Sequence, residues 1–153
     1  MIKVLFVCTG NICRSPTAEG VFRHLAGEAG LAQEFHVESA GTEGFHVGEP
    51  PDPRSIAMAQ RNGVSIEAQR ARRLSETDYH DFDHIFAMDS GHYREIEARA
   101  PKKYRARLDM FLRGGGEVPD PWYGYEKDFN EVYALIHTGA KSLLQQLREE
   151  HQV

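Results

Sequence analysis

The sequence predicts an α/β fold in which a parallel β-sheet lies between two layers of helices. Short apolar runs, typical of strands buried on both faces, alternate along the chain with segments whose apolar residues recur at helical spacing. This alternation favours parallel strands joined by right-handed crossovers. The length of 153 residues fits a single domain, residues 1–153, because no linker, repeat or low-complexity segment divides the chain.

The first strand and the first helix are predicted at the start of the chain. Residues 2–7 are apolar apart from one lysine, as expected for a strand inside a sheet. Ser15 is a good N-cap, Pro16 is a good first helical residue, and Gly30 is a typical helix stop. The apolar stripe of this helix consists of Ala18, Val21, Phe22, Leu25, Ala26 and Ala29.

The next segment predicts a strand, a loop and a second helix. Residues 35–40 predict a short strand, and residues 41–51 form a loop rich in Gly and Pro. Open α/β sheets bind ligands beside the loops that follow the carboxyl ends of their strands, so we expect this loop near a binding site. Asp52-Pro53 is typical of a helix start and Asn62-Gly63 of a helix end, which predicts a helix between them.

The second half of the chain predicts two more strands and a long helix. Residues 85–88 predict a buried strand, Asp89 is suited to cap the helix after it, and residues 105–108 predict a fourth strand. Asp128 and Glu131 form a capping-box pattern. The apolar residues that then repeat at helical spacing are Phe129, Val132, Tyr133, Ile136, Ala140, Leu143, Leu144 and Leu147.

The loop between the first strand and the first helix collects the groups that bind a phosphoryl group. Gly10 and Asn11 tolerate positive φ, so the loop can turn its backbone N–H groups inward as an anion-binding nest. The following helix N-terminus adds partial positive charge, and Arg14 adds a guanidinium that grips two phosphate oxygens. A cysteine such as Cys8 is usually a small buried hydrophobe, but in this cradle we expect a reactive thiolate.

Two segments far apart in the chain carry a family resemblance. Cys8 to Ser15 forms a Cys-x5-Arg-Ser loop after the first strand, and Asp120-Pro121-Trp122-Tyr123 lies far downstream. Weaker matches are Pro51 to Arg54, Ala71-Arg72 and Met88-Asp89. In this order and spacing the chain resembles the low-molecular-weight protein tyrosine phosphatases. The resemblance implies a three-layer sandwich with helices on both faces of a four-stranded parallel sheet in the order 2-1-3-4.

The resemblance also implies roles for individual residues. It makes Cys8 the nucleophile, Arg14 the phosphoryl-binding group and Asp120 the general acid of a phosphotyrosine hydrolase with a phosphocysteine intermediate. The alternative for Asp120 is a turn-forming residue that bonds its own backbone. The resemblance further implies that Asn11 holds the strained loop and that Ser15 hydrogen-bonds the thiolate. The remaining residues of the phosphate-binding loop are Thr9, Gly10, Ile12 and Cys13.

Three aromatic residues are candidates for a substrate slot. By position Phe45 corresponds to an aromatic residue that lines the slot in the resembled family, although packing on its own domain is an equal alternative. Trp122 and Tyr123 are suited to flank a flat ring at the mouth of a deep pocket. Phosphoserine would be too short to bring its phosphorus to Cys8, so we expect phosphotyrosine and small aryl phosphates as substrates.

Two other classes of protein share part of this pattern. A thiol-dependent arsenate reductase has the same fold and loop, but it needs further cysteines in the middle of the chain, and Cys13 is the only cysteine besides Cys8. A non-catalytic phosphate-binding module needs neither a nucleophile nor an acid such as Asp120. Both classes remain alternatives to a phosphatase.

Cys13, Arg72 and Asp89 are candidates for supporting roles. Cys8 and Cys13 lie on one small loop, so a reversible disulfide between them is expected to protect Cys8 from irreversible oxidation, the alternative being that Cys13 packs under the loop. Arg72 is expected either on a solvated face or against a carboxylate near the site. Asp89 is expected as a structural carboxylate at the active-site end of its strand.

No metal and no cofactor is predicted. His80 and His84 have the spacing of two zinc ligands on a helix, but the apolar run after them predicts a turn into a strand instead. Arg14, the nest and the helix dipole already supply the positive charge that phosphoryl transfer needs.

The composition restricts the kinds of partner and the cellular compartment that we expect. The net charge of −5 gives no indication of nucleic-acid binding, and no apolar run approaches the ~18 residues that span a membrane. Two cysteines close together do not form a secreted disulfide framework, and residues 1–4 do not resemble a signal peptide. We therefore expect a cytoplasmic enzyme that acts on tyrosine-phosphorylated protein, with its natural substrate and its oligomeric state left open.

Overall fold

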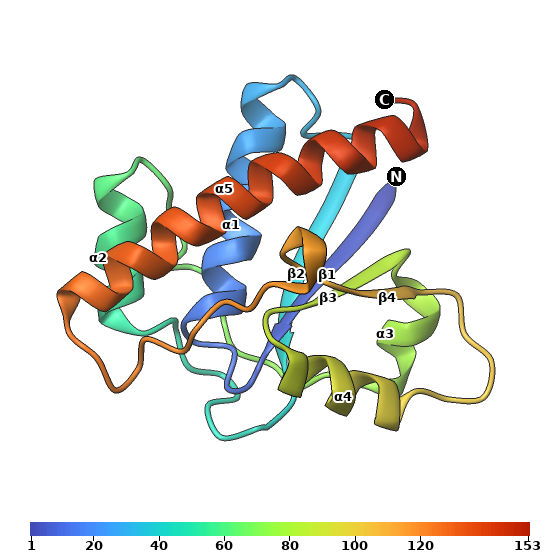
Figure 1. Cartoon of the computed structure of the whole chain (residues 1–153), viewed down its shortest axis with the longest axis horizontal. Helices are drawn as coiled ribbons and strands as arrows, with labels where there is room; N and C mark the ends of the chain where they lie inside the picture. Colours follow the sequence, from blue (N-terminus) through green and yellow to red (C-terminus); the bar gives the residue numbers. More distant parts are fainter.

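Four parallel strands form one sheet in the order β2-β1-β3-β4, as expected (Figure 1). The computed structural model describes all residues from 1 to 153. The strands are β1 (Ile2–Cys8), β2 (Phe35–Gly41), β3 (His84–Ala87) and β4 (Arg107–Met110). The fourth strand begins two residues later than predicted. The backbone N–H groups of Arg105 and Ala106 both donate to the carbonyl of Tyr79, so they are not free to join the sheet.

Helices cover both faces of the sheet, so the predicted three layers are present (Figure 1). One face is covered by α1, α2 and α5, and the other by α3 and α4. None of the helices has the length and apolarity needed to cross a membrane. The helices are α1 (Arg14–Glu28), α2 (Pro53–Arg61), α3 (Glu76–Asp81), α4 (Ser90–Arg99) and α5 (Glu126–His151), with a 3₁₀ turn η1 (Arg113–Gly115) before α5.

The central strand β1 divides the core into two halves because its side chains alternate between the faces. Val4 and Phe6 join the apolar cluster under α1 and α5, whereas Leu5 and Val7 join the cluster under α3 and α4. All four side chains are fully buried, which explains why the strand reads as a continuous apolar run. Burial on both faces fixes the end of β1, and therefore the position of Cys8.

The long helix α5 confirms its predicted apolar stripe but begins earlier than predicted. All eight residues of the stripe are buried, and they pack mainly against α1 and α2. Asp128 is not the N-cap. It lies in the first turn, where its Oδ2 accepts the backbone N–H of Tyr125 at 2.7 Å. A carboxylate in the first turn satisfies a free N–H at the helix start. The sequence pattern alone does not distinguish a residue in this position from an N-cap residue.

Candidate active site

The loop that follows β1 surrounds a cavity of about 330 Å³ at the carboxyl end of the sheet. Residues from three loops meet there, namely the loops after β1, after β2 and before α5. All of the predicted catalytic residues line this cavity. The lining consists of Cys8, Thr9, Gly10, Ile12, Cys13, Arg14, Phe45, His46, Asp120, Trp122 and Tyr123.

Ser15 contacts the sulfur of Cys8 and does not cap the helix. The Ser15 Oγ lies 3.0 Å from the Cys8 Sγ, as the resemblance implies. The prediction that Ser15 is the N-cap and Pro16 the first helical residue is wrong, because α1 already begins at Arg14. Cys13 occupies the N-cap position without a side-chain cap. A serine before a proline is equally suited to cap a helix or to make a buried hydrogen bond. Here its hydroxyl contacts the Cys8 sulfur instead of capping the helix.

Asn11 holds the loop through three hydrogen bonds. Its φ of 59° is one of only two positive values at non-glycine residues, so its backbone is in a strained region. The buried amide donates to Ser15 Oγ at 2.7 Å and to Ser39 Oγ at 2.9 Å. The side-chain carbonyl of Asn11 accepts the backbone N–H of Arg72 at 3.1 Å. These contacts support the implied role of Asn11, whereas Gly10 does not take a positive φ.

Arg14 is buried and held from two sides. Its Nη1 donates to Asp89 Oδ2 at 2.8 Å and to the Val118 carbonyl at 3.0 Å. The Asp89 carboxylate also caps α4 by accepting the N–H of His92, so it lies where the sequence predicted, at the end of β3. A guanidinium with one nitrogen fixed in this way is oriented before any anion arrives.

His92 joins the site, although no sequence pattern pointed to a functional role for it. Its Nε2 lies 2.8 Å from Thr9 Oγ1 and 3.4 Å from Arg14 Nη2. Since Arg14 can only donate, we assign the ring proton to Nδ1, which lies 3.2 Å from Asp89 Oδ1. Burial and the charge of Arg14 lower the pKa of His92 to about 4. The ring is therefore neutral at pH 7 and bridges the loop to α4.

The neutral state of His92 predicts acid sensitivity. Unfolding restores an ordinary pKa of 6.5, so the unfolded chain binds a proton that the folded chain excludes. Well above pH 6.5 His92 adds no pH dependence, and from there toward pH 4 its protonation should lower the free energy of unfolding by roughly 3 kcal/mol. Urea unfolding across this range measures the slope. His92→Asn should make the slope shallower, while buried His84, whose pKa is also lowered, keeps part of it. An unchanged slope in the variant would contradict the assignment.

Asp120 reaches the same cavity from the loop before α5. Its Oδ2 lies 3.7 Å from Arg14 Nη2, and its side chain is 45% exposed. The Oδ1 accepts the backbone N–H of Trp122 at 3.0 Å. The carboxyl group thus holds its own turn with one oxygen and presents the other toward the phosphate site.

The mouth of the cavity is lined by the three predicted aromatic residues. Phe45 and Tyr123 are 74% and 87% exposed, and Trp122 contacts Tyr123 edge-to-face at 4.7 Å between ring centroids. Arg54 ties this loop to the start of α2, because its Nη2 donates both to the Trp122 carbonyl and to Asp52. This contact links the Pro51 to Arg54 segment to the loop that carries Asp120.

The family model described as low molecular weight phosphotyrosine protein phosphatase matches residues 3–153. The chain belongs to this family. It is 40% identical to the low molecular weight protein-tyrosine-phosphatase YfkJ of Bacillus subtilis, with all of both chains covered. It is also 40% identical to the low molecular weight phosphotyrosine protein phosphatase of Schizosaccharomyces pombe, covering 95% of this chain and 97% of that one. A protein tyrosine phosphatase structure from Entamoeba histolytica covers 100% of both chains with a TM-score of 0.91 and 35% identity.

Cys13 of this low-molecular-weight phosphatase is buried at the N-cap position of α1 and lines the cavity. Burial, together with the negative charges of Asp52 and Cys8, raises the pKa of the Cys13 thiol to about 12. Both cysteines are free. Cys13 is therefore a protonated thiol at neutral pH, and it does not compete with Cys8 as a nucleophile.

Arg72 contacts two carboxylates, in agreement with the second of its two expected positions. Its guanidinium bonds Asp78 at 3.0 Å and Glu38 at 3.2 Å, while its backbone N–H supports Asn11. The histidine pair considered for zinc is not brought together on one helix. His80 is an exposed residue of α3, whereas His84 is buried in β3 and lies near a different histidine.

Proposed function

We propose that this chain hydrolyses phosphotyrosine in proteins through a phosphocysteine intermediate, with Cys8, Arg14 and Asp120 as its catalytic residues. The observation that carries this proposal is that all three line one cavity at the carboxyl end of the sheet. We treat residues 1–153 as one phosphatase domain. The two alternatives, an arsenate reductase and a non-catalytic binding module, are less favoured. The chain has no third cysteine for the first, and it keeps a nucleophile and an acid that the second does not need.

In the first step the Cys8 thiolate attacks phosphorus in line with the bond to the leaving oxygen. The S–P bond forms as the P–O bond breaks, and the electron pair of that bond passes to the leaving oxygen. Arg14 and the N–H groups of residues 9–15 stabilise the equatorial oxygens, which carry the transition-state charge. Asp120, initially protonated, gives its proton to the leaving phenolate oxygen.

In the second step water attacks the phosphocysteine. Asp120, now a carboxylate, takes a proton from the water as the O–P bond forms, and the thiolate of Cys8 departs. The hydroxyl of Ser15, 3.0 Å from the sulfur, donates a hydrogen bond that stabilises the departing thiolate. The residues named supply the nucleophile, the proton and the positive charge, so the proposed cycle uses no cofactor.

The shape of the site supports an aryl substrate. Cys8 lies at the base of the cavity and is buried, whereas Phe45, Trp122 and Tyr123 lie at its mouth. A phosphotyrosine ring has the length to bridge these two levels and a flat face to contact the aromatic side chains. A reducing compartment such as the cytoplasm suits an enzyme whose nucleophile is a free thiol, and we propose that location.

The proposal is tested with a matched pair of phosphopeptides in buffer containing a metal chelator. One peptide carries phosphotyrosine and the other phosphoserine in the same flanking sequence. We expect phosphate release from the first at a kcat/KM at least ~100-fold higher than from the second, because only the ring bridges the cavity. Equal rates, or hydrolysis that requires added metal, would contradict the proposal.

The loop should also give reversible inactivation by peroxide. The Cys8 thiolate attacks peroxide and becomes a sulfenic acid, and the Cys13 thiol then displaces water to form a disulfide. The high pKa of Cys13 makes the second step slow, so the disulfide should build up after activity is lost. Cys13→Ala should lose activity at a similar rate but should not recover it with dithiothreitol after prolonged exposure. Equal recovery in the variant would mean that Cys13 only packs under the loop.

A further inference from the structure

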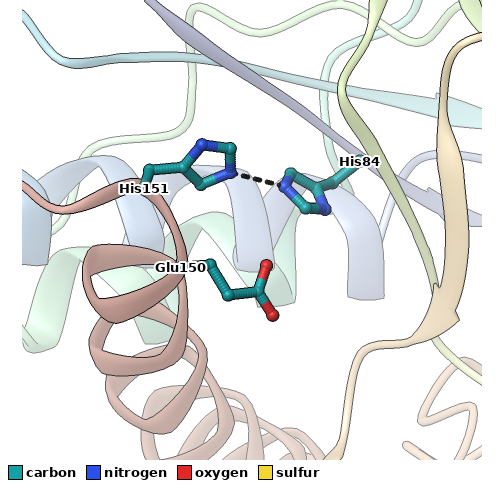
Figure 2. Close-up of side chains that lie close together, drawn as sticks. All are labelled: His84, Glu150 and His151. Atoms are coloured by element: carbon teal, nitrogen blue, oxygen red, sulfur yellow. Dashed lines mark hydrogen bonds between the residues drawn. The ribbon is translucent and has the colours of Figure 1, made fainter.

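A second cluster of ligand-type side chains lies at the opposite end of the sheet from the catalytic loop. His84 begins β3, and Glu150 and His151 are the last two residues of α5. The chain termini lie at this end of the molecule, away from the loop that follows β1 (Figure 1). Figure 2 shows the two imidazole rings joined through one nitrogen of each, with the carboxylate of Glu150 beside them. The proposed hydrolysis uses none of these residues.

The three side chains converge on one point. One ligand atom from each residue lies within 4.8 Å of the other two, and the two Nε2 atoms are 2.9 Å apart. Zinc–nitrogen bonds of about 2.0 to 2.1 Å separate two tetrahedral ligands by roughly 3.3 Å. To hold an ion, the two Nε2 atoms need to separate by a few tenths of an ångström, and their rings need to turn so that both lone pairs point at the ion. The Glu150 carboxylate, which has an oxygen within 4.8 Å of a ring nitrogen of each histidine, needs to move toward them.

The cluster is built on rigid elements. His84 is buried, and its ring stacks on Phe86 with an interplanar angle of 7° and meets the His151 ring edge-to-face. The ring of His84 is thus oriented by its neighbours in the sheet. His151 and Glu150 lie at the exposed end of α5, so an ion has an entry path from solvent.

We propose that His84, Glu150 and His151 form a divalent-metal site of the zinc type, which clamps the end of α5 to β3. Two imidazoles and a carboxylate are a donor set that zinc prefers, with solvent completing the coordination. In the metal-free protein one Nε2 donates to the other. The ion uses both Nε2 lone pairs, so the donor ring carries its proton on Nδ1 instead, and Glu150 supplies the negative charge.

Arg107 competes with the ion for Glu150. Its Nη1 lies 3.3 Å from Glu150 Oε2, and the other carboxylate oxygen accepts from Gln146 at 3.1 Å. Arg107 is 62% exposed and lies in the edge strand, so its side chain can move aside. Removing its charge should therefore strengthen metal binding, a result that a purely structural histidine pair would not give.

The experiment uses the full chain, purified without a polyhistidine tag and stripped of metal. Zn²⁺ at a hundred times its dissociation constant should raise Tm by about 5 to 10 °C. Co²⁺ should give the visible absorption of a tetrahedral site without the intense sulfur charge-transfer bands that binding at Cys8 or Cys13 would produce. His151→Ala and Glu150→Gln should each weaken binding about 10-fold or more. Arg107→Gln should tighten it.

The control is His80→Ala, which removes an exposed histidine of α3 that lies outside the cluster. It should bind Zn²⁺ and Co²⁺ as the wild type does. His84→Ala is not needed, because the loss of a buried ring can unfold the protein, whereas His151 lies at an exposed helix end. Two results would overturn the proposal: cobalt spectra with sulfur ligation only, or equal Zn²⁺ shifts of Tm in wild type and His151→Ala.

Discussion

Cys8→Ser should reduce steady-state phosphatase turnover to less than about a thousandth of wild type. A serine hydroxyl stays protonated in the same cradle, so no anion is available to attack phosphorus. The fold should survive, because serine is nearly isosteric and its Oγ can take the hydrogen bond that the sulfur makes with Ser15 at 3.0 Å. Release of p-nitrophenol and of phosphate from a phosphotyrosine peptide measures the loss.

Binding distinguishes a lost nucleophile from a damaged loop. Inorganic phosphate should still raise the Tm of Cys8→Ser, because Arg14 and the loop N–H groups remain in place. Cys13→Ser, the substitution of the other cysteine on the same loop, should retain measurable turnover. Turnover of Cys8→Ser above a thousandth of wild type would show that Cys8 is not the sole nucleophile.

The parts of the fold and site that could be predicted depend on local pattern. The Cys-x5-Arg loop follows a strand whose burial on both faces produces a continuous apolar run, so Cys8 and Arg14 could be assigned before the fold was known. Asp120-Pro121-Trp122-Tyr123 is similarly a local motif, and it marked Asp120 as a candidate. The strand order came from the family resemblance, because periodicity does not determine which strands are neighbours.

The errors arose where one residue type suits two local roles. Ser15 can cap a helix or bond a thiol, and Asp128 can be an N-cap or a first-turn acceptor. Contacts of two histidines with distant segments had no local sequence signal. His92 meets Thr9 across 83 positions and His84 meets His151 across 67, and no spacing rule links such residues. The pairing of β3 with β1 and the packing of α5 against α1 bring these residues together.

Asp120→Ala should slow hydrolysis in proportion to how poorly the leaving group departs without a proton. The phenolate of tyrosine has a pKa of about 10 and needs protonation, so phosphotyrosine cleavage should slow by roughly 100-fold to 10,000-fold. p-Nitrophenolate is a better leaving group, so its release should slow less. The rates must be single-turnover rates, because the same carboxylate serves as base in the second step and phosphocysteine can accumulate.

The pH profile of the cleavage step provides a second readout. Its acidic limb reports ionisation of the thiol and the substrate, and it should persist in Asp120→Ala. Its basic limb reports loss of the proton from Asp120, and it should flatten because the variant has no proton to lose.

Asp120→Asn separates proton donation from positioning of the loop. The amide oxygen of asparagine can still accept the Trp122 N–H that Asp120 Oδ1 accepts at 3.0 Å, so the turn is preserved without an acid. If Asp120 is the general acid, the asparagine variant should lose as much phosphotyrosine activity as the alanine variant. The opposite outcome has three parts. Asp120→Asn restores most of the activity, Asp120→Ala slows the cleavage of both substrates by the same factor, and the basic limb of its pH profile remains. Asp120 would then only position the loop, and another residue would be the acid.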